Sequence, residues 1–358
     1  MDSRIAVLTS ILPQDCDGAL IVSETNRRYL TDFVSSLGYL FITREKALLL
    51  VDSRYEEAAK SRAQHCEVVL FHKLYDDIKE LLTKYRLKRV LLEGSAFTLN
   101  ETEKMETAFR QAGTEAVKTS ELDRLISSMR VIKTAYEIEK MRQAQKLTER
   151  AFNETIKLIK EGVTERELAL ELEFRMRRAG ADGVSFDLIV LTGAKTSMPH
   201  GVPGYQTVHY GDFVLFDIGA TVDGYHSDMT RTVAYGKVSD SQRRIYKTVL
   251  QAQLNALEAV HEGARCGEVD KAARSYIDQA GYQGFFGHST GHGVGLDIHE
   301  SPSVSPNSDY MLHSGMVITV EPGIYVPGRC GVRIEDMVMV TTEGHVNLAS
   351  LPKSLLEL

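Results

Sequence analysis

The segment DIGATVDGYHSD constrains the fold of this chain most, because it places two aspartates on either side of a tight-turn signal. Asp217 and Asp228 are eleven residues apart, and the Asp-Gly pair at 223–224 lies almost at their midpoint. Asp-Gly is typical of a two-residue β-hairpin turn, so the two carboxylates are predicted to lie nearly opposite each other. Like charges in facing positions are destabilising, and a positive group is therefore expected between them.

A second acidic pair has the same layout. In EPGIYVPGRCGVRIED, Glu321 and Glu335 are fourteen residues apart, with Gly328 at their midpoint. The residues VPGRCG supply the turn chemistry, so these carboxylates are also expected to face each other across a hairpin. Four carboxylates brought together are costly without cations, and two divalent ions would balance their charge. The sequence therefore predicts a site for two metal ions.

The segment HSTGHGVGLDIHE adds imidazoles beside permissive backbone. It contains His288, His292 and His299 around glycines that let the backbone pass close to a crowded site. One histidine can ligate a metal while the others donate hydrogen bonds, and SMPHGVPG contributes a fourth, His200. Each of these elements alone is more often an ordinary turn or loop. Their joint occurrence indicates one site.

The order of apolar and helical patterns predicts two domains. Residues 1–125 are expected to form a smaller α/β domain without a catalytic cluster, with strands at 19–23, 39–43, 47–51, 67–71 and 90–93 and helices at 54–64, 75–86 and 100–112. Residues 126–358 repeat one order, two helices and then strands, with helices at about 134–160, 164–180, 241–262 and 267–280. The predicted fold class is α+β, with a catalytic domain of two similar halves after the α/β domain.

The motifs SMPHG, GDFVLFDIGATVDGYHSDMTRT, GHSTGHGVGLDIHE, TVEPGIYVPG and GVRIED stand in this order along the chain. Through these motifs the chain resembles the Xaa-Pro peptidases of the pita-bread metallopeptidase family, aminopeptidase P and prolidase. The resemblance extends to RVIKTAYEIEKMRQA at 130–144 and, in the amino-terminal part, to NRRYLTDF and VDSRYEEAA. It implies a pita-bread catalytic domain and a homodimer.

The resemblance also implies a ligand set and roles. Asp228 and Glu335 would bridge two ions, Asp217 would hold one of them, and His292 with Glu321 would hold the other. His200, His288 and His299 match substrate-binding or neighbouring histidines, and Arg333 matches a basic residue beside the site. Three residues depart from the family pattern or have no role in it, namely Cys330, His226 and His209.

The implied reaction is hydrolysis of the first peptide bond by a hydroxide that two metals share. Glu321 would carry the proton to the leaving nitrogen, and His288 and His299 would donate to the oxyanion. His200 would touch the proline side. An oxygen-rich site with a single imidazole favours Mn²⁺ over Zn²⁺, with Co²⁺, Fe²⁺ and Zn²⁺ as alternatives.

Substrate length depends on how a free carboxylate would be held. Archaeal prolidases that resemble this chain have an arginine four residues after the histidine that corresponds to His299, where the chain has Ser303. A serine carries no charge, so the sequence favours an Xaa-Pro aminopeptidase acting on peptides with proline second. The alternative is an Xaa-Pro dipeptidase whose cation comes from Arg329 or Arg333.

Other functional classes fit less well. Metal-free relatives, both binding proteins and creatinase, have altered ligand positions, whereas all five ligands are present here. Methionine aminopeptidase lacks an amino-terminal domain of this kind. A net charge of −7 disfavours nucleic acid and anionic membranes as partners. The start lacks a secretory pattern and the four cysteines form no close pair, so a cytoplasmic protein is expected.

Overall fold

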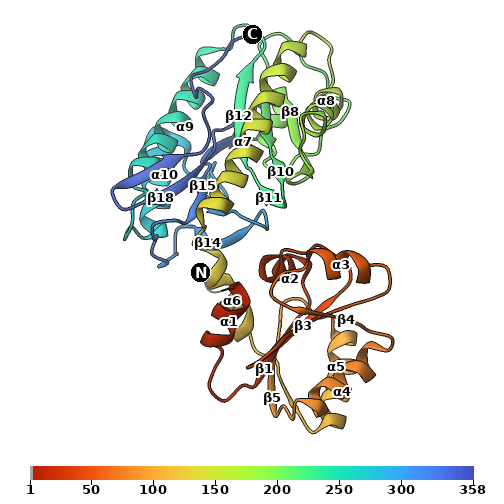
Figure 1. The fold of residues 1–358 in the computed structure, drawn as a ribbon. Coiled ribbons are helices and arrows are strands. Elements are labelled where there is room, and N and C mark those ends of the chain that lie inside the picture. Colours follow the sequence, from red (N-terminus) through yellow and green to blue (C-terminus); the bar gives the residue numbers. More distant parts are fainter. Residues whose placement is uncertain (1–2) are drawn as a thin grey trace. The chain divides into compact units, whose positions relative to one another are not determined.

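The computed structural model describes residues 3–358 and divides into two compact units, one ending at Arg130 and one beginning at Val131 (Figure 1). The boundary expected after residue 125 falls inside helix α6 (Glu121–Arg130), which continues because Leu122 and Ile126 are buried on one face. The fold is α+β, with a smaller unit before the larger one.

The first unit is built on a mixed sheet with the strand order β4-β3-β2-β1-β5-β6. Its strands are β1 (Gly18–Ile21), β2 (Tyr39–Thr43), β3 (Ala47–Val51), β4 (Glu67–Leu70), β5 (Arg89–Leu92) and β6 (Glu115–Val117). Strand β1 runs antiparallel to β2 and parallel to β5. The sequence does not predict β6, which is only three residues long and gives no periodic signal.

The helices of this unit are α1 (Arg4–Ile11), α2 (Glu24–Thr31), α3 (Glu56–Arg62), α4 (Leu74–Lys84), α5 (Leu99–Ala112) and α6. Helix α5 begins at a capping box between Thr98 and Glu101 and ends at Gly113, whose φ of 71° suits glycine. Phe41 and Phe109 lie in one buried cluster between the sheet and its helices.

The second unit has the predicted order of two helices followed by strands, twice over. The first half contains α7 (Ala135–Thr155), α8 (Glu165–Arg178), β7 (Gly183–Val184), β8 (Ile189–Thr192), β9 (Phe213–Ile218), β10 (Ala220–Val222), β11 (Tyr225–His226) and β12 (Met229–Ala234). Helix α7 ends five residues before the predicted position, because the chain tightens into a 3₁₀ turn at Ile156–Leu158. A capping box of Thr164 and Glu167 begins α8.

The second half repeats this order. It contains α9 (Asp240–Glu258), α10 (Cys266–Ile277), β13 (Gly291–Gly293), β14 (Glu300–Val304), β15 (Val317–Val320), β16 (Gly323–Val326), β17 (Cys330–Arg333), β18 (Asp336–Thr341) and β19 (Gly344–Asn347). Strands β12-β9-β8 form one sheet and β14-β13-β15-β18-β19 another.

Each helix pair covers the strands of its own half (Figure 1). Phe152 of α7 meets Phe216 of β9 edge to face, with ring centroids 5.4 Å apart. On the other side, Val249 of α9 and Val269 of α10 lie in one buried cluster with Ile318 of β15. Because helices cover the outer faces, the strand ends between the halves are left to form a site.

The register of the strands decides how the two acidic pairs face each other. Val222 pairs with Tyr225 around a two-residue turn, in which Asp223 and Gly224 have φ of 52° and 70°. On the longer ladder, Asp217 pairs with Thr230 rather than with Asp228. The predicted facing of the aspartates is therefore wrong by two residues. Because side chains alternate along a strand, both aspartates still project to the same face.

The glutamates do face each other. Val320 pairs with Asp336 on one side of them, and Gly323 pairs with Arg333 on the other. Glu321 and Glu335 thus occupy opposite positions between two ladders of one register.

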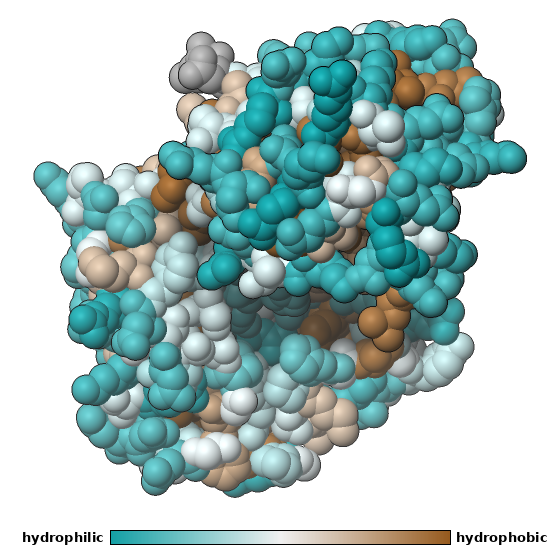
Figure 2. All heavy atoms as spheres, turned by 90° about the horizontal axis from the view of Figure 1, so that it is seen from below, coloured by the Kyte–Doolittle hydropathy of each residue, from teal (hydrophilic) through white to brown (hydrophobic). Residues whose placement is uncertain are grey.

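Within residues 3–358, none of the helices has the length and apolar character needed to span a membrane. The face drawn in Figure 2 is mainly hydrophilic, and its apolar residues lie in small separate groups.

Candidate metal centre

A cavity of about 480 Å³ lies between the two halves of the second unit and brings the predicted site residues together. Its walls include all five predicted ligands, Asp217, Asp228, His292, Glu321 and Glu335. They also include His200, His288, His299, Ser303 and Arg333. The first half supplies the aspartates and the second half supplies the imidazole and the glutamates, so the site depends on both halves.

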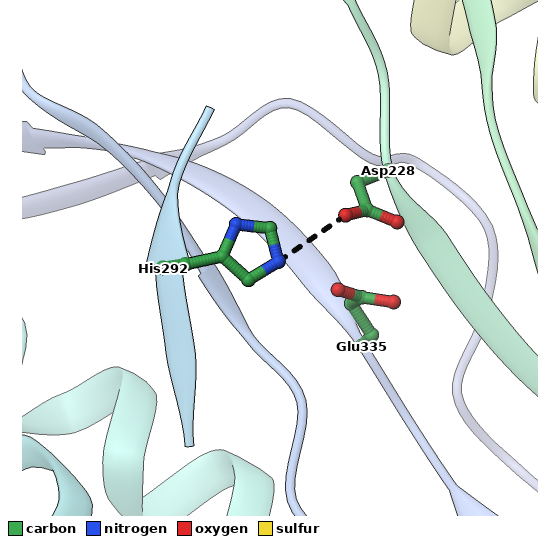
Figure 3. A group of neighbouring side chains, drawn as sticks. All are labelled: Asp228, His292 and Glu335. Carbon is green, nitrogen blue, oxygen red and sulfur yellow. Dashed lines mark ion pairs between the residues drawn. The ribbon is translucent and has the colours of Figure 1, made fainter. Parts of the chain in front are cut away.

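Three of the five ligands form a tight group. One ligand atom from each of Asp228, His292 and Glu335 lies within 4.8 Å of the other two. Figure 3 shows the imidazole of His292, on β13, and the carboxylates of Asp228 and Glu335, each from a segment between two strands, pointing toward one another. His292 Nε2 is 3.6 Å from Asp228 Oδ2 and 3.4 Å from Glu321 Oε1. Its Nδ1 donates to the carbonyl of Gly293 at 3.0 Å, which leaves Nε2 for a metal ion.

The protein alone does not supply enough positive charge to keep these clustered carboxyl groups ionised. Burial raises the pKa of Glu321 to about 8. Burial, together with the neighbouring carboxylates, also raises the pKa of Asp228 and Glu335 well above their ordinary values. Burial lowers the pKa of His292 to about 4, so this imidazole is neutral at pH 7. Neutral imidazole and clustered carboxylates that resist ionisation are the donor set that divalent cations bind and deprotonate.

One cation, Arg333, touches the ligands directly. Its Nη2 donates to Asp217 at 2.5 Å, and its Nε donates to Thr230 Oγ1 at 3.1 Å. Thr230 in turn donates to Glu335 Oε2 at 2.7 Å. These bonds fix the orientation of one carboxylate from each acidic pair.

Tyr325 extends this network to a histidine. Its hydroxyl accepts from Arg333 Nη1 at 2.7 Å and lies 2.8 Å from His288 Nε2. His288 Nδ1 donates to the carbonyl of Ser289 at 2.8 Å, and burial lowers the pKa of His288 to about 4. With Nδ1 carrying the proton, the neutral ring accepts a hydrogen bond from the Tyr325 hydroxyl at Nε2. The donor role of His288 toward a substrate oxygen stays a prediction.

No role was predicted for Tyr325 or Thr230. Tyr325 stands four residues after Glu321 in EPGIYVPG, and Thr230 stands two after Asp228. On strands, residues at even offsets project to one face. That periodicity is the signal by which both could have been found.

The remaining predicted residues divide into those inside and those outside the cavity. The ring of His299 lies edge to face against His292, with centroids 4.4 Å apart, and His200 lies on the cavity wall. His209 is exposed and pairs with Glu161. Among the residues that line the cavity, neither His226, Arg329 nor Cys330 occurs. Cys330 is buried at the start of β17.

Known proteins resemble this chain in sequence and fold over nearly its whole length. The B. anthracis protein described as Xaa-Pro dipeptidase has a solved structure that is 38% identical, covers 99% of both chains and superposes with a TM-score of 0.95. The X-Pro aminopeptidase structure from Thermotoga maritima MSB8 is 36% identical, covers 96% of this chain and 98% of its own, and has a TM-score of 0.89. The Xaa-Pro dipeptidase of Pyrococcus furiosus is 35% identical over 99% of this chain and 100% of its own length.

Two family descriptions match the two units. Residues 6–132 match the Creatinase/Prolidase N-terminal domain. Residues 139–342, which include every cavity residue named above, match Metallopeptidase family M24. The chain therefore belongs to the pita-bread metallopeptidase family M24, and in this chain a creatinase/prolidase-type domain precedes the M24 domain.

Proposed function

We propose that this protein is a metal-dependent Xaa-Pro dipeptidase. The observation that carries this proposal is the meeting of four carboxylates and one neutral imidazole, from both halves of the second unit, on the wall of one cavity. Relatives that match over nearly their whole length are described as Xaa-Pro dipeptidases. For this reason we prefer the dipeptidase to the aminopeptidase that the sequence favours.

Two divalent ions would be held by Asp217, Asp228, His292, Glu321 and Glu335. When bound, such ions supply an activated water and polarise the scissile carbonyl. The oxygen-rich donor set supports Mn²⁺ as the preferred ion. Arg333 and a single divalent ion would leave one of the four carboxylate charges uncompensated, which supports a second ion.

The side chains around the ions would divide the remaining work. Glu321 would take a proton from the attacking water and deliver it to the proline nitrogen. His299, beside His292, would donate to the oxygen that becomes negative. His200 would contact the proline side of the substrate from the opposite wall.

The free carboxylate of a dipeptide also needs a partner. Among the described residues that line the cavity, Arg333 is the one lysine or arginine. Its guanidinium is 3% exposed and bonded to Asp217 and Tyr325. We assign the substrate carboxylate to the end of the cavity near Arg333 and His200, where its charge would be offset.

A second candidate is an Xaa-Pro aminopeptidase. Ser303 lies on the cavity wall and offers a hydroxyl without charge, which would leave room for a continuing peptide. The Thermotoga relative is described as an X-Pro aminopeptidase. Both observations concern peptide length and leave the proposed bond cleavage unchanged.

The deciding experiment compares kcat/KM for Ala-Pro and Ala-Pro-Ala with the same Mn²⁺-loaded enzyme. A preference for Ala-Pro is expected. A preference for the tripeptide would replace the dipeptidase with the aminopeptidase, and failure to cleave either peptide would refute both. Light scattering of the same preparation tests a homodimer, which we propose from the family resemblance.

A further inference from the structure

Helix α10 binds the backbone of the segment that carries His288 through side-chain hydrogen bonds. Arg274 lies on this helix, and its Nη1 donates to the carbonyl of Phe286 at 2.8 Å. Its Nη2 donates to the carbonyl of His288, also at 2.8 Å. One guanidinium thus holds two alternate carbonyls of the backbone immediately before β13, and one of them belongs to the histidine itself.

Asp270, one helical turn earlier, orients this guanidinium. Its two carboxylate oxygens accept from Arg274 Nε and Nη2, both at 2.8 Å. The same carboxylate accepts from the backbone N–H and the hydroxyl of Thr290, at 3.2 and 2.8 Å. The side chain of Asp270 is 1% exposed. A bidentate pair of this kind fixes both distance and plane, so the segment is held on both sides of His288.

The rings of the segment are held as well. The guanidinium carbon of Arg274 lies 4.2 Å from the centre of the Phe286 ring, within cation–π range. The Phe286 ring in turn meets the His288 ring edge to face, with centroids 4.9 Å apart and planes at 89°. Arg274 therefore constrains both the backbone and the ring plane of His288.

Neither Asp270 nor Arg274 lines the cavity, whereas His288 does. We propose that Asp270 and Arg274 are positioning residues, which act on peptide hydrolysis by holding His288 against Tyr325 at the cavity wall. This inference rests on the proposed function, because it assigns His288 to the substrate cavity of a peptidase. The rival view is that the pair only ties α10 to a loop and stabilises the fold.

A double-mutant cycle separates the two views. Arg274→Met removes the guanidinium. Arg274→Lys keeps the positive charge but cannot donate to both carbonyls in the same geometry. In the wild-type background, kcat/KM for Ala-Pro is expected to fall roughly 10–100-fold for Arg274→Met, the range typical of partners that orient a functional residue. Arg274→Lys should recover only part of this loss. In the His288→Ala background, Arg274→Met should cause no further loss.

Arg175 provides a matched control on α8. Its side chain is 24% exposed, against 23% for Arg274, and it pairs with Glu171 and Glu154. Arg175→Met should therefore leave kcat/KM unchanged. Equal losses from Arg274→Met with and without His288 would overturn the proposal and leave a structural role alone. If Arg274→Met does not fold, the cycle is run with Arg274→Lys, and the same two outcomes decide.

Hydrogen exchange in the metal-free protein gives a readout that needs no activity. Faster exchange over residues 286–290 is expected in Arg274→Met and not in Arg175→Met. Unchanged exchange there would contradict the proposed grip. If the wild-type enzyme cleaves neither peptide, the proposed function fails while the exchange experiment still judges whether Arg274 holds this segment.

Discussion

Ser303 and His292 are cross-strand partners on β14 and β13. The hydroxyl that stands four residues after His299 therefore lies beside the imidazole proposed to hold a metal. Both residues line the same cavity.

Ser303→Arg should consequently improve recognition of dipeptides. A guanidinium on this wall would add a charge-assisted hydrogen bond to the free carboxylate. The ratio of kcat/KM for Ala-Pro over Ala-Pro-Ala should rise by a factor that corresponds to about 1–3 kcal/mol of transition-state stabilisation. Ser303→Gln, of similar reach without charge, is the control. An unchanged ratio in both variants would show that the carboxylate is held elsewhere.

Glu335→Ala should disable the site, because Glu335 is assigned to both ions. Metal content should fall below two per chain, and kcat/KM should fall by more than about 100-fold, beyond the range for residues next to a ligand. Elemental analysis and assay of the same sample check both. Normal metal content with normal activity would remove Glu335 from the ligand set.

The histidines should separate metal binding from substrate binding. His292→Ala should lose metal, because Nε2 is free and 3.6 Å from Asp228. His299→Ala should retain metal and lose activity, since His299 is placed outside the ligand set. His226→Ala, outside the cavity, serves as the control with little effect on kcat/KM. Loss of metal from His299→Ala but not from His292→Ala would reverse the assignment.

The metal-free protein should become less stable as the pH rises above neutrality. Burial raises the pKa of Glu321 from 4.5 to about 8, so the folded state binds this proton more tightly than the unfolded chain does. The resulting stability is complete below pH 4.5 and is lost as the pH rises through 8. Asp228 and Glu335 shift in the same direction.

The useful window lies between pH 6.5 and about 8.5, because below it the lowered pKa of His292 has the opposite effect. The melting temperature of the metal-free protein should fall across this window. The metal-saturated protein should show a smaller fall, since bound cations favour the ionised carboxylates. A metal-free protein that becomes more stable across this window would contradict the buried, protonated carboxyls.

Much of the site could be predicted because its acidic residues occur in pairs, one on each side of a turn motif. Glu321 and Glu335 lie opposite each other as the midpoint of their hairpin requires. The turn at Asp223 and Gly224 was predicted at the right place, but the midpoint of Asp217 and Asp228 lies one residue before its centre. An offset of one residue at the centre moves the cross-strand partner by two positions, from Asp228 to Thr230.

Contacts between distant segments could not be predicted. Tyr325 reaches His288 across 37 residues, and Arg333 reaches Asp217 across 116. The neutral state of His288 depends on burial, which a motif does not encode. Helices α1 and α2, each eight residues long, were also not predicted, whereas the seven-residue α3 was.

Asp217, Asp228, His292, Glu321 and Glu335 are proposed to hold two divalent ions for hydrolysis of an Xaa-Pro bond. The most direct test removes metal with a chelator and titrates Mn²⁺ back while both bound metal and Ala-Pro hydrolysis are followed. Two ions per chain are predicted, with no hydrolysis before metal returns and full activity at saturation. Undiminished hydrolysis of Ala-Pro by the metal-free protein would contradict the claim.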